Sequence, residues 1–252
     1  DTSQGPQTIT VEAGVTDDVS GVESVSAMFR SPAYQRIHLF LSPTEVPGRW
    51  SATGEVPRYS EQGTWRLEQI AVKDVAGNYG AVEHQELTAA GMDRSFEQTG
   101  PGDVVGPRLA GLDFTPKEIN TSDGPQEITV TLRITDDLAG FNSGTISFWG
   151  PGKVCQISCE SGHQAVRLTF YSSERVSGTE TDGTYVGKMV LPQYSELGTW
   201  TVHWVQLHDN ARNETFLIED NPDPTFMEGR HGEVSALGFP VTFRNGCAQI
   251  PC

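Results

Sequence analysis

The chain has 252 residues and a formal net charge of −16, from 33 acidic and 17 basic residues. The acidic excess extends over both halves, because residues 1–100 hold 14 acidic against 7 basic side chains and the remainder holds 19 against 10. Nucleic acids and anionic membrane surfaces require a basic face, and a membrane-spanning helix requires about 18 consecutive apolar residues, which the sequence lacks. We therefore expect neither a nucleic-acid partner nor membrane insertion.

The first predicted strand, residues 9–15, lies in a segment that occurs twice. Residues 1–32 return at 120–151 with 15 of 32 positions identical, at a constant offset of 119. In both copies apolar residues alternate with polar ones, and this period of two predicts a strand with one face in a core. The alternating apolar residues are Ile9, Val11, Ala13 and Val15 in the first copy, and Ile128, Val130, Leu132 and Ile134 in the second.

Further strands follow at short intervals. Alternation at residues 25–29, 37–41 and 50–56 predicts three of them, and residues 56–78 then return at 191–213 with 10 of 23 positions identical. In this second repeated block the apolar series changes phase, because Trp65 and Leu67 are followed by Ile70 rather than by residue 69. This indicates an extra residue near Glu68 and Gln69, a β-bulge, which the second copy repeats.

Two copies of one domain therefore fill the chain. The repeat offset grows from 119 to 135 and then to 147, which places insertions of 16 and 12 residues in the second copy. Apart from helical turns expected at 86–91 and 233–238, the short strands and Gly, Pro, Asn and Asp turns predict an all-β fold of two tandem sandwiches. We expect a first domain at 1–99, a semi-rigid linker at 100–107 and a second domain at 108–252.

Only the second copy is preceded by a further predicted strand. Residues 104–119 contain Leu109, Leu112 and Phe114, which are typical of an edge strand that covers one side of a core. The first copy has no counterpart, so its sheet edge should expose unpaired backbone groups. The missing strand would come either from upstream residues of a longer polypeptide or from a neighbouring molecule by strand donation.

Four repeated blocks resemble the immunoglobulin-like repeats of secreted and surface-attached bacterial proteins. They are Thr16–Gly21 with Thr135–Gly140, Tyr59–Trp65 with Tyr194–Trp200, Asp74–Asn78 with Asp209–Asn213, and Leu237–Phe243. The resemblance covers most of both copies and implies two tandem immunoglobulin-like β-sandwich domains used as a spacer, adhesion or substrate-binding module. The chain departs from the repeats in its cysteine-bearing insertion and at Arg212, where the first copy has Gly77.

The paired carboxylates are the best candidate for a site. In a sandwich of this topology the acidic loops open at one end of each domain, and in the second domain they face the linker. Oxygen ligands on turns suit calcium, whereas the same residues are also ordinary turn formers that bond their own backbone. The candidate metal ligands are Asp17, Asp18, Asp74 and Asn78 in the first copy, Asp136, Asp137, Asp209 and Asn213 in the second, and Asp103 in the linker.

Tryptophans and cysteines supply the remaining candidates. Trp65 and Trp200 lie on the core-facing positions. Trp149 replaces Arg30 of the first copy, and Trp204 is expected in the bulge, where the first copy has Gln69. On an exposed sheet face these two rings would stack on a sugar ring or contact another protein, whereas packing against the 16-residue insertion would bury them. Four cysteines permit three pairings, and we expect the two local disulfides in an oxidising compartment; zinc binding is the weaker alternative. These cysteines are Cys155 with Cys159 and Cys247 with Cys252.

The sequence contains no nucleophile elbow, phosphate loop or helix-borne His-Glu motif. We therefore expect a non-catalytic extracellular or cell-surface module that spaces or joins neighbouring domains or subunits and is rigidified by calcium. A carbohydrate-binding accessory module of a secreted enzyme, carried by Trp149 and Trp204, is the alternative. The polar sequence at Asp1 is typical of a mature or excised chain.

Overall fold

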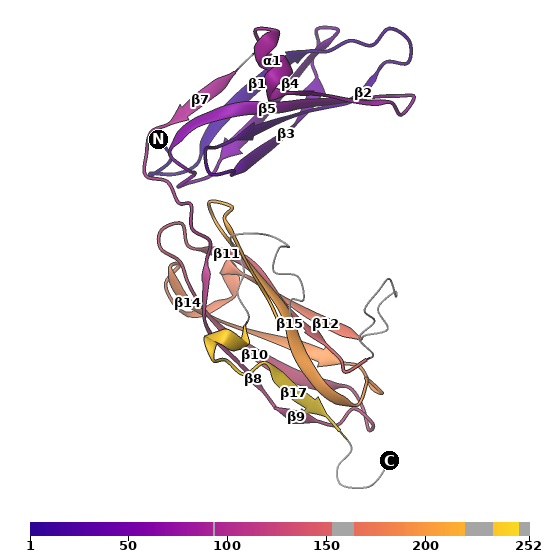
Figure 1. Ribbon diagram of the computed structural model, residues 1–252, viewed down its shortest axis with the longest axis vertical. Coiled ribbons are helices and arrows are strands. Elements are labelled where there is room, and N and C mark those ends of the chain that lie inside the picture. The colour runs from indigo at the N-terminus through magenta and orange to yellow at the C-terminus, as the bar shows by residue number, and fades with distance from the viewer. Residues whose placement is uncertain (93, 153–163, 220–233, 247–252) are drawn as a thin grey trace. The chain divides into compact units, whose positions relative to one another are not determined.

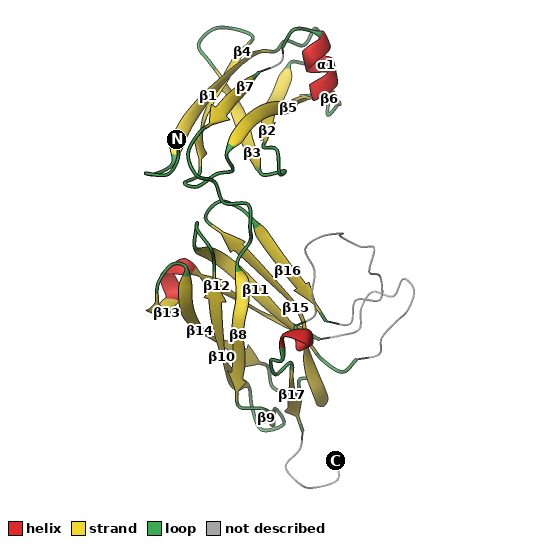
Figure 2. Cartoon of the chain, turned by 60° about the vertical axis from the view of Figure 1, so that its left-hand side comes forward, coloured by secondary structure: helices red, strands yellow, loops and turns green. Residues whose placement is uncertain are grey.

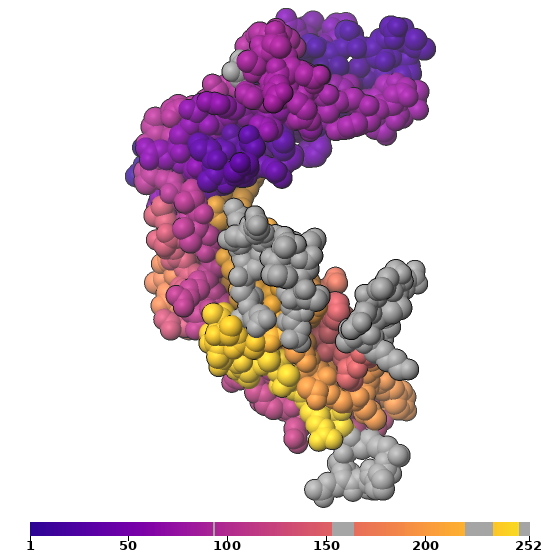
Figure 3. Space-filling model, viewed as in Figure 1, coloured from indigo at the N-terminus to yellow at the C-terminus, as the bar shows by residue number. Residues whose placement is uncertain are grey.

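The computed structural model describes residues 1–92, 94–152, 164–219 and 234–246 (Figure 1). These residues are built almost entirely of β-strands, so the predicted all-β fold is confirmed (Figure 2). The chain divides into two compact units, Asp1–Val104 and Val105–Cys252, which are described separately below and shown in space-filling form in Figure 3.

Helices are few and short in the described residues. None of them is long and apolar enough to cross a membrane. Two lie at the helical turns predicted near residues 86–91 and 233–238, and the third lies within the longer insertion of the second copy. They are α1 (His84–Ala89), the 3-10 helix η2 (Ser235–Leu237) and the 3-10 helix η1 (Ser172–Glu174).

The first unit is a two-layered sheet with the strand order β1-β4-β3-β2-β5-β6, in which β7 also pairs with β5. Strand β3 joins the layers, because residues 36–41 pair with β2 while Ser42 and Pro43 pair with β4. The strands are β1 (Gln7–Gly14), β2 (Val22–Arg30), β3 (Arg36–Pro43), β4 (Arg49–Val56), β5 (Gly63–Asp74), β6 (Tyr79–Glu83) and β7 (Ser95–Gln98).

Strand β5 carries the bulge that the sequence predicts. Met28 pairs with Gln69 and the next residue, Phe29, pairs with Leu67, so Glu68 is the extra residue. The second unit repeats the irregularity between Ser147 and Phe148 of its equivalent strands. The bulge lets the apolar side chains on both sides of it face one core, as the phase change requires.

The Tyr-Ser-Glu-x-Gly-Thr-Trp block forms a tight corner before β5. Tyr59 adopts a positive φ of 60°, the Ser60 hydroxyl donates to the Pro57 carbonyl (2.8 Å), and the buried Trp65 ring donates to the Glu61 carbonyl (2.9 Å). The corner therefore fixes both the chain direction and the core tryptophan. The second unit repeats it with Tyr194 (φ 65°), Ser195 to Pro192 (2.7 Å) and Trp200 to Glu196 (2.9 Å).

The second unit consists of a four-stranded sheet, β13-β14-β10-β8, and a six-stranded sheet, β12-β11-β15-β17-β9, in which β16 also pairs with β15. One apolar cluster fills the space between their inward-facing residues. The strands are β8 (Arg108–Thr115), β9 (Glu118–Ile119), β10 (Gln126–Thr135), β11 (Phe141–Trp149), β12 (Ala165–Tyr171), β13 (Arg175–Gly178), β14 (Asp182–Leu191), β15 (Gly198–Asp209), β16 (Glu214–Ile218) and β17 (Thr242–Asn245).

Strand β8 is the opening strand that the sequence predicts ahead of the second copy. It pairs antiparallel with β10, and its residues Leu109, Leu112 and Phe114 belong to the buried cluster. Strand β1, the counterpart of β10, pairs with β4 and lies at the end of its sheet order. Within residues 1–92 and 94–104 no strand occupies the position that β8 has in the second unit.

Candidate functional site

Asp17 closes the first acidic turn on itself. One carboxylate oxygen, Oδ1, accepts hydrogen bonds from the backbone N–H groups of Val19 (3.0 Å), Ser20 (2.7 Å) and Gly21 (2.8 Å). The hydrogen bond from Gly21, followed by that from Val19, lowers the pKa of the exposed carboxyl group. These bonds assign Asp17 a turn-forming role.

Asp74 and Asn78 form the second acidic turn of the first unit. Asp74 accepts the Asn78 backbone N–H at Oδ1 and the Asn78 amide at Oδ2, each at 2.7 Å. The side-chain bond from Asn78 is the main cause that lowers the pKa of Asp74. The backbone N–H of Val75 donates to the Gly21 carbonyl (3.0 Å), so the two acidic turns of this unit lie together at one end of the sheet.

The second unit repeats this arrangement around Asp209 and Asn213. Asp209, which is 2% exposed, accepts the backbone N–H and the side-chain amide of Asn213, again at 2.7 Å each. The adjacent Asn210 donates its backbone N–H to the Gly140 carbonyl (3.0 Å) and its amide to the Ala139 carbonyl (2.9 Å). In both copies, backbone hydrogen bonds therefore join the two acidic turns at one end of the unit, an arrangement called the acidic clasp below.

Asp136 differs from its counterpart Asp17. Its Oδ1 accepts the N–H groups of Leu138 and Gly140, whereas its Oδ2 is buried and accepts no hydrogen bond from the described residues. Burial raises the pKa of this carboxyl group, opposite in direction to the shift at Asp17. Carboxylate oxygens of Asp136 and Asp209 lie within 4.8 Å of each other.

The structure also shows why Asp136 is more buried. The β13–β14 hairpin, which the first unit lacks, lies against the turn, because the Thr181 carbonyl accepts the Asp136 N–H (2.9 Å) and the Glu180 carbonyl accepts the Phe141 N–H (3.0 Å). Sequence reasoning missed Glu180 and Thr181. The only signal for them was the 16-residue insertion that precedes β14.

The other three predicted ligands are Asp18, Asp137 and Asp103. The side chains of Asp18 and Asp137 are exposed. Asp103 belongs to the first unit, where its N–H donates to the Tyr59 carbonyl (2.8 Å) and its carbonyl accepts the Gln35 amide (2.6 Å). These backbone bonds fix Asp103 beside the Tyr59 corner of its own unit.

Trp149 and Trp204 are both half-buried on the second unit, and each packs on a neighbouring ring. Trp149 stacks on His203 with centroids 3.4 Å apart, and Trp204 stacks on Phe216 at 5.9 Å. The extra residue of the β15 bulge is His203, because Trp204 pairs in register with Ser147. The expectation that Trp204 itself occupies the bulge is therefore wrong by one residue.

The proposed disulfides fall outside the described residues. Cys155 and Cys159 lie in residues 153–163, and Cys247 and Cys252 lie in residues 247–252. Both pairings stay predictions. The core assignment of Trp65 and Trp200 is confirmed, since these side chains are 1% and 2% exposed.

The sequence matches the family described as Domain of unknown function (DUF7035) over residues 102–228. No curated protein matches it. Among solved structures, a leucine-rich repeat protein from Bacteroides thetaiotaomicron VPI-5482 shows 10% identity over 83% of this chain and a TM-score of 0.24, and this chain covers 23% of that protein. The CBD12 structure from CALX1.2 shows 14% identity and a TM-score of 0.21, with 81% of this chain and 76% of that chain covered.

Proposed function

Because the chain belongs to the family described as Domain of unknown function (DUF7035), whose description names no activity, we propose its function from the geometry of the two units. It is a non-catalytic tandem module of an extracellular or cell-surface protein. Its immunoglobulin-like sandwiches space or join neighbouring domains or subunits, and calcium stiffens the second sandwich.

The observation that carries this proposal is the acidic clasp. In each unit an Asp-Asn pair, Asp74 with Asn78 or Asp209 with Asn213, closes one turn and the neighbouring turn bonds to it. The duplicated element therefore joins the ends of neighbouring strands by hydrogen bonds, which favours a mechanical role for the repeat. Duplication that keeps such turns while other loops diverge is typical of repeated scaffold modules.

The second clasp is the part that suits calcium. The buried Oδ2 of Asp136 has no hydrogen-bond donor among the described residues, and the Asp209 carboxylate lies within 4.8 Å. Two carboxylates at this distance repel each other. Calcium binds oxygen ligands in loose geometry at about 2.3–2.6 Å, so an ion between the two carboxylates could contact an oxygen of each. Asp136 and Asp209 would hold the ion, and its charge would remove the cost of burying Asp136.

Calcium titration of metal-free protein tests this proposal. At a free calcium concentration of about 100 times Kd, the second unit should gain about 2.7 kcal/mol, and its melting temperature should rise by about 5–11 °C. Asp136→Asn keeps the turn acceptor but should abolish the calcium-dependent shift, whereas Asp17→Asn in the first unit should leave it unchanged. An unchanged melting temperature and an unchanged solution scattering profile after chelation would contradict a calcium-stiffened spacer.

Carbohydrate binding is the second candidate, and it rests on Trp204. This ring lies on a half-buried part of β15 beside Phe216, and the Arg167 guanidinium is 5.6 Å from its centroid. An aromatic surface with an adjacent cation suits a sugar ring that carries polar or anionic groups. A glycan array that shows binding by the wild type and its loss in Trp204→Ala, but not in Trp149→Ala, would favour this candidate over the spacer.

A further inference from the structure

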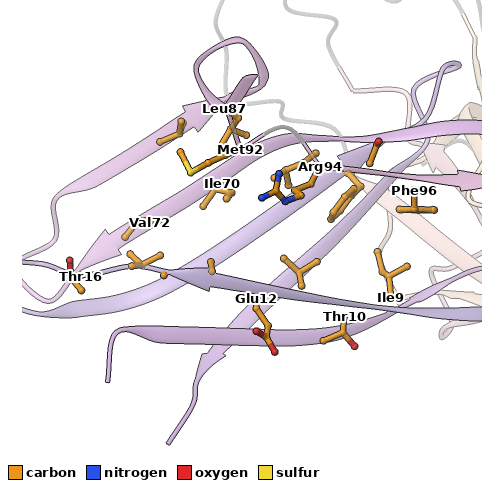
Figure 4. Close-up of a pocket in the computed structure, with 18 residues that line it drawn as sticks. Ile9, Thr10, Glu12, Thr16, Ile70, Val72, Leu87, Met92, Arg94 and Phe96 are labelled. Carbon is orange, nitrogen blue, oxygen red and sulfur yellow. The ribbon is translucent and has the colours of Figure 1, made fainter. Parts of the chain in front are cut away.

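One face of β1 in the first unit opens onto an apolar groove. The groove has a volume of about 840 Å³ and runs between the β1 edge and the residues that precede β7 (Figure 4). Ile9 lies on one side of the groove and Leu87 and Met92 lie on the opposite side, as Figure 4 shows, and Ile70 and Val72 also line it. All of these residues belong to the first unit.

The second unit shows what fills the equivalent space. There the four inward-facing residues of β10 are 0% exposed, because β8 pairs with β10 and inserts Leu109, Leu112 and Phe114 into the core. The equivalent residues of β1 remain only half-buried. The residues compared are Ile128, Val130, Leu132 and Ile134 in β10, and Ile9, Val11, Ala13 and Val15 in β1.

We propose that this groove is a strand-acceptor site, which binds an extended segment of a partner polypeptide in antiparallel register with β1. Two features require a strand. The backbone of β1 pairs on one side with β4 and has no strand on the other among the described residues of its unit, and the lining is apolar at the spacing of alternate strand residues. The free edge of β1 would form backbone hydrogen bonds with the partner strand, and the groove would select partner strands with apolar side chains at alternate positions.

The repeat gives the register of the partner strand. In the second unit Phe114 pairs with Val130, Leu112 with Leu132 and Leu109 with Ile134. Subtraction of the repeat offset of 119 places apolar partner side chains opposite Val11, Ala13 and Val15. Two of the partner's apolar side chains therefore lie two positions apart, and the third follows after a one-residue irregularity like that of β8.

Charge restricts the partner further. In the same register Asp113 of β8 pairs with Thr131, whose counterpart on β1 is Glu12, a residue that lines the groove. Like charges directly opposite each other on paired strands are unfavourable. The partner strand therefore carries a basic residue at this position, which also suits the net charge of −16. The occupant is a β8-type strand with one basic substitution, presented by another polypeptide.

The test uses the whole chain and three synthetic peptides of residues 107–116. The first peptide carries Asp113→Lys, the second carries both Asp113→Lys and Leu112→Asp, and the third has the unmodified sequence. We expect the first peptide to bind saturably, to shift and protect the backbone amides of β1, and to bind about three to ten times more tightly than the unmodified sequence, consistent with a change in a cross-strand charge pair. The second peptide should not bind.

Two variants of the protein locate the binding to the groove. Met92→Asn removes an apolar side chain from the groove and should weaken the first peptide about tenfold, whereas Val46→Asn, at an exposed position of the same unit, should change its affinity less than twofold. Both residues are already more than a third exposed, at 46% and 59%, so both variants should fold.

Three results would overturn the proposal. The first is peptide binding that leaves the β1 amides unchanged or that is equally tight for the first and the second peptide. The second is concentration-dependent association of the protein alone through β1, which would make a second copy the occupant. The third is loss of peptide binding in a form of the protein extended ahead of Asp1, which would assign the strand to the protein itself.

Discussion

Truncation of Phe114 tests whether β8 closes the core of the second unit. The Phe114 ring is 1% exposed and meets the rings of Phe148 and Phe243 edge-on, at 5.3 and 6.0 Å, while the Lys117 ammonium lies 3.5 Å from its centroid. Phe114→Ala leaves a cavity at this position and removes both ring pairs. The free energy of unfolding of the second unit should therefore fall by about 3–5 kcal/mol.

The assay must separate the two units, because the first contains no part of β8. Hydrogen exchange followed peptide by peptide should show lower protection in β10 and β11 and unchanged protection in β2 and β5. The thermal transition of the second unit should fall by roughly 6–20 °C, on the basis of about 2–4 °C per kcal/mol for a unit of this size. Tyr171→Ala, at a side chain of the same unit that is 55% exposed, is the control and should change stability by less than about 0.5 kcal/mol.

A loss of less than about 1 kcal/mol in β10 would refute the reasoning, since it would mean that β8 lies on the core without completing it. An equal loss of hydrogen-exchange protection in β2 would also refute it, because the stability of the first unit would then depend on β8 as well.

Two further predictions follow from polar residues. Asn245, which is fully buried, accepts a hydrogen bond from the Thr121 N–H and donates its side-chain amide to the Thr121 hydroxyl and to two backbone carbonyls. Asn245→Ala should therefore lower the free energy of unfolding of the second unit, measured by urea titration, by roughly 3–5 kcal/mol. Asn142→Ala, which removes one exposed hydrogen bond, should lower it by less than about 1 kcal/mol. The pKa values of Asp17 and Asp74 are lowered below 3.8, so the stabilisation from both carboxylates is present above that pH and is lost as the pH falls through their folded-state pKa values. Acid titration of the first unit should show this loss, and Asp74→Asn should reduce it; an unchanged acid profile in the variant would contradict the assignment.

Much of the fold follows from local sequence. Alternation at Ile9–Val15 and its repeat at residues 128–134 determined the strands, because a period of two places one set of side chains in a core wherever the strand lies. The phase change after Leu67 located the bulge for the same reason. The residue that bulges was harder to assign: an extra residue shifts the pattern equally whether it is His203 or Trp204, and only the register with Ser147 distinguishes them.

The properties of the candidate sites depend on tertiary contacts. Asp17 and Asp136 have the same local sequence, Thr-Asp-Asp, and the same turn hydrogen bonds, yet their pKa values shift in opposite directions, because the β13–β14 hairpin buries only Asp136. The groove beside β1 likewise reflects a neighbour that is present in one unit only, since the inward residues of β1 and β10 share one pattern but differ in burial. Sequence determined which residues face inward, and tertiary structure decided which of them are covered, because burial depends on strands that lie far away along the chain.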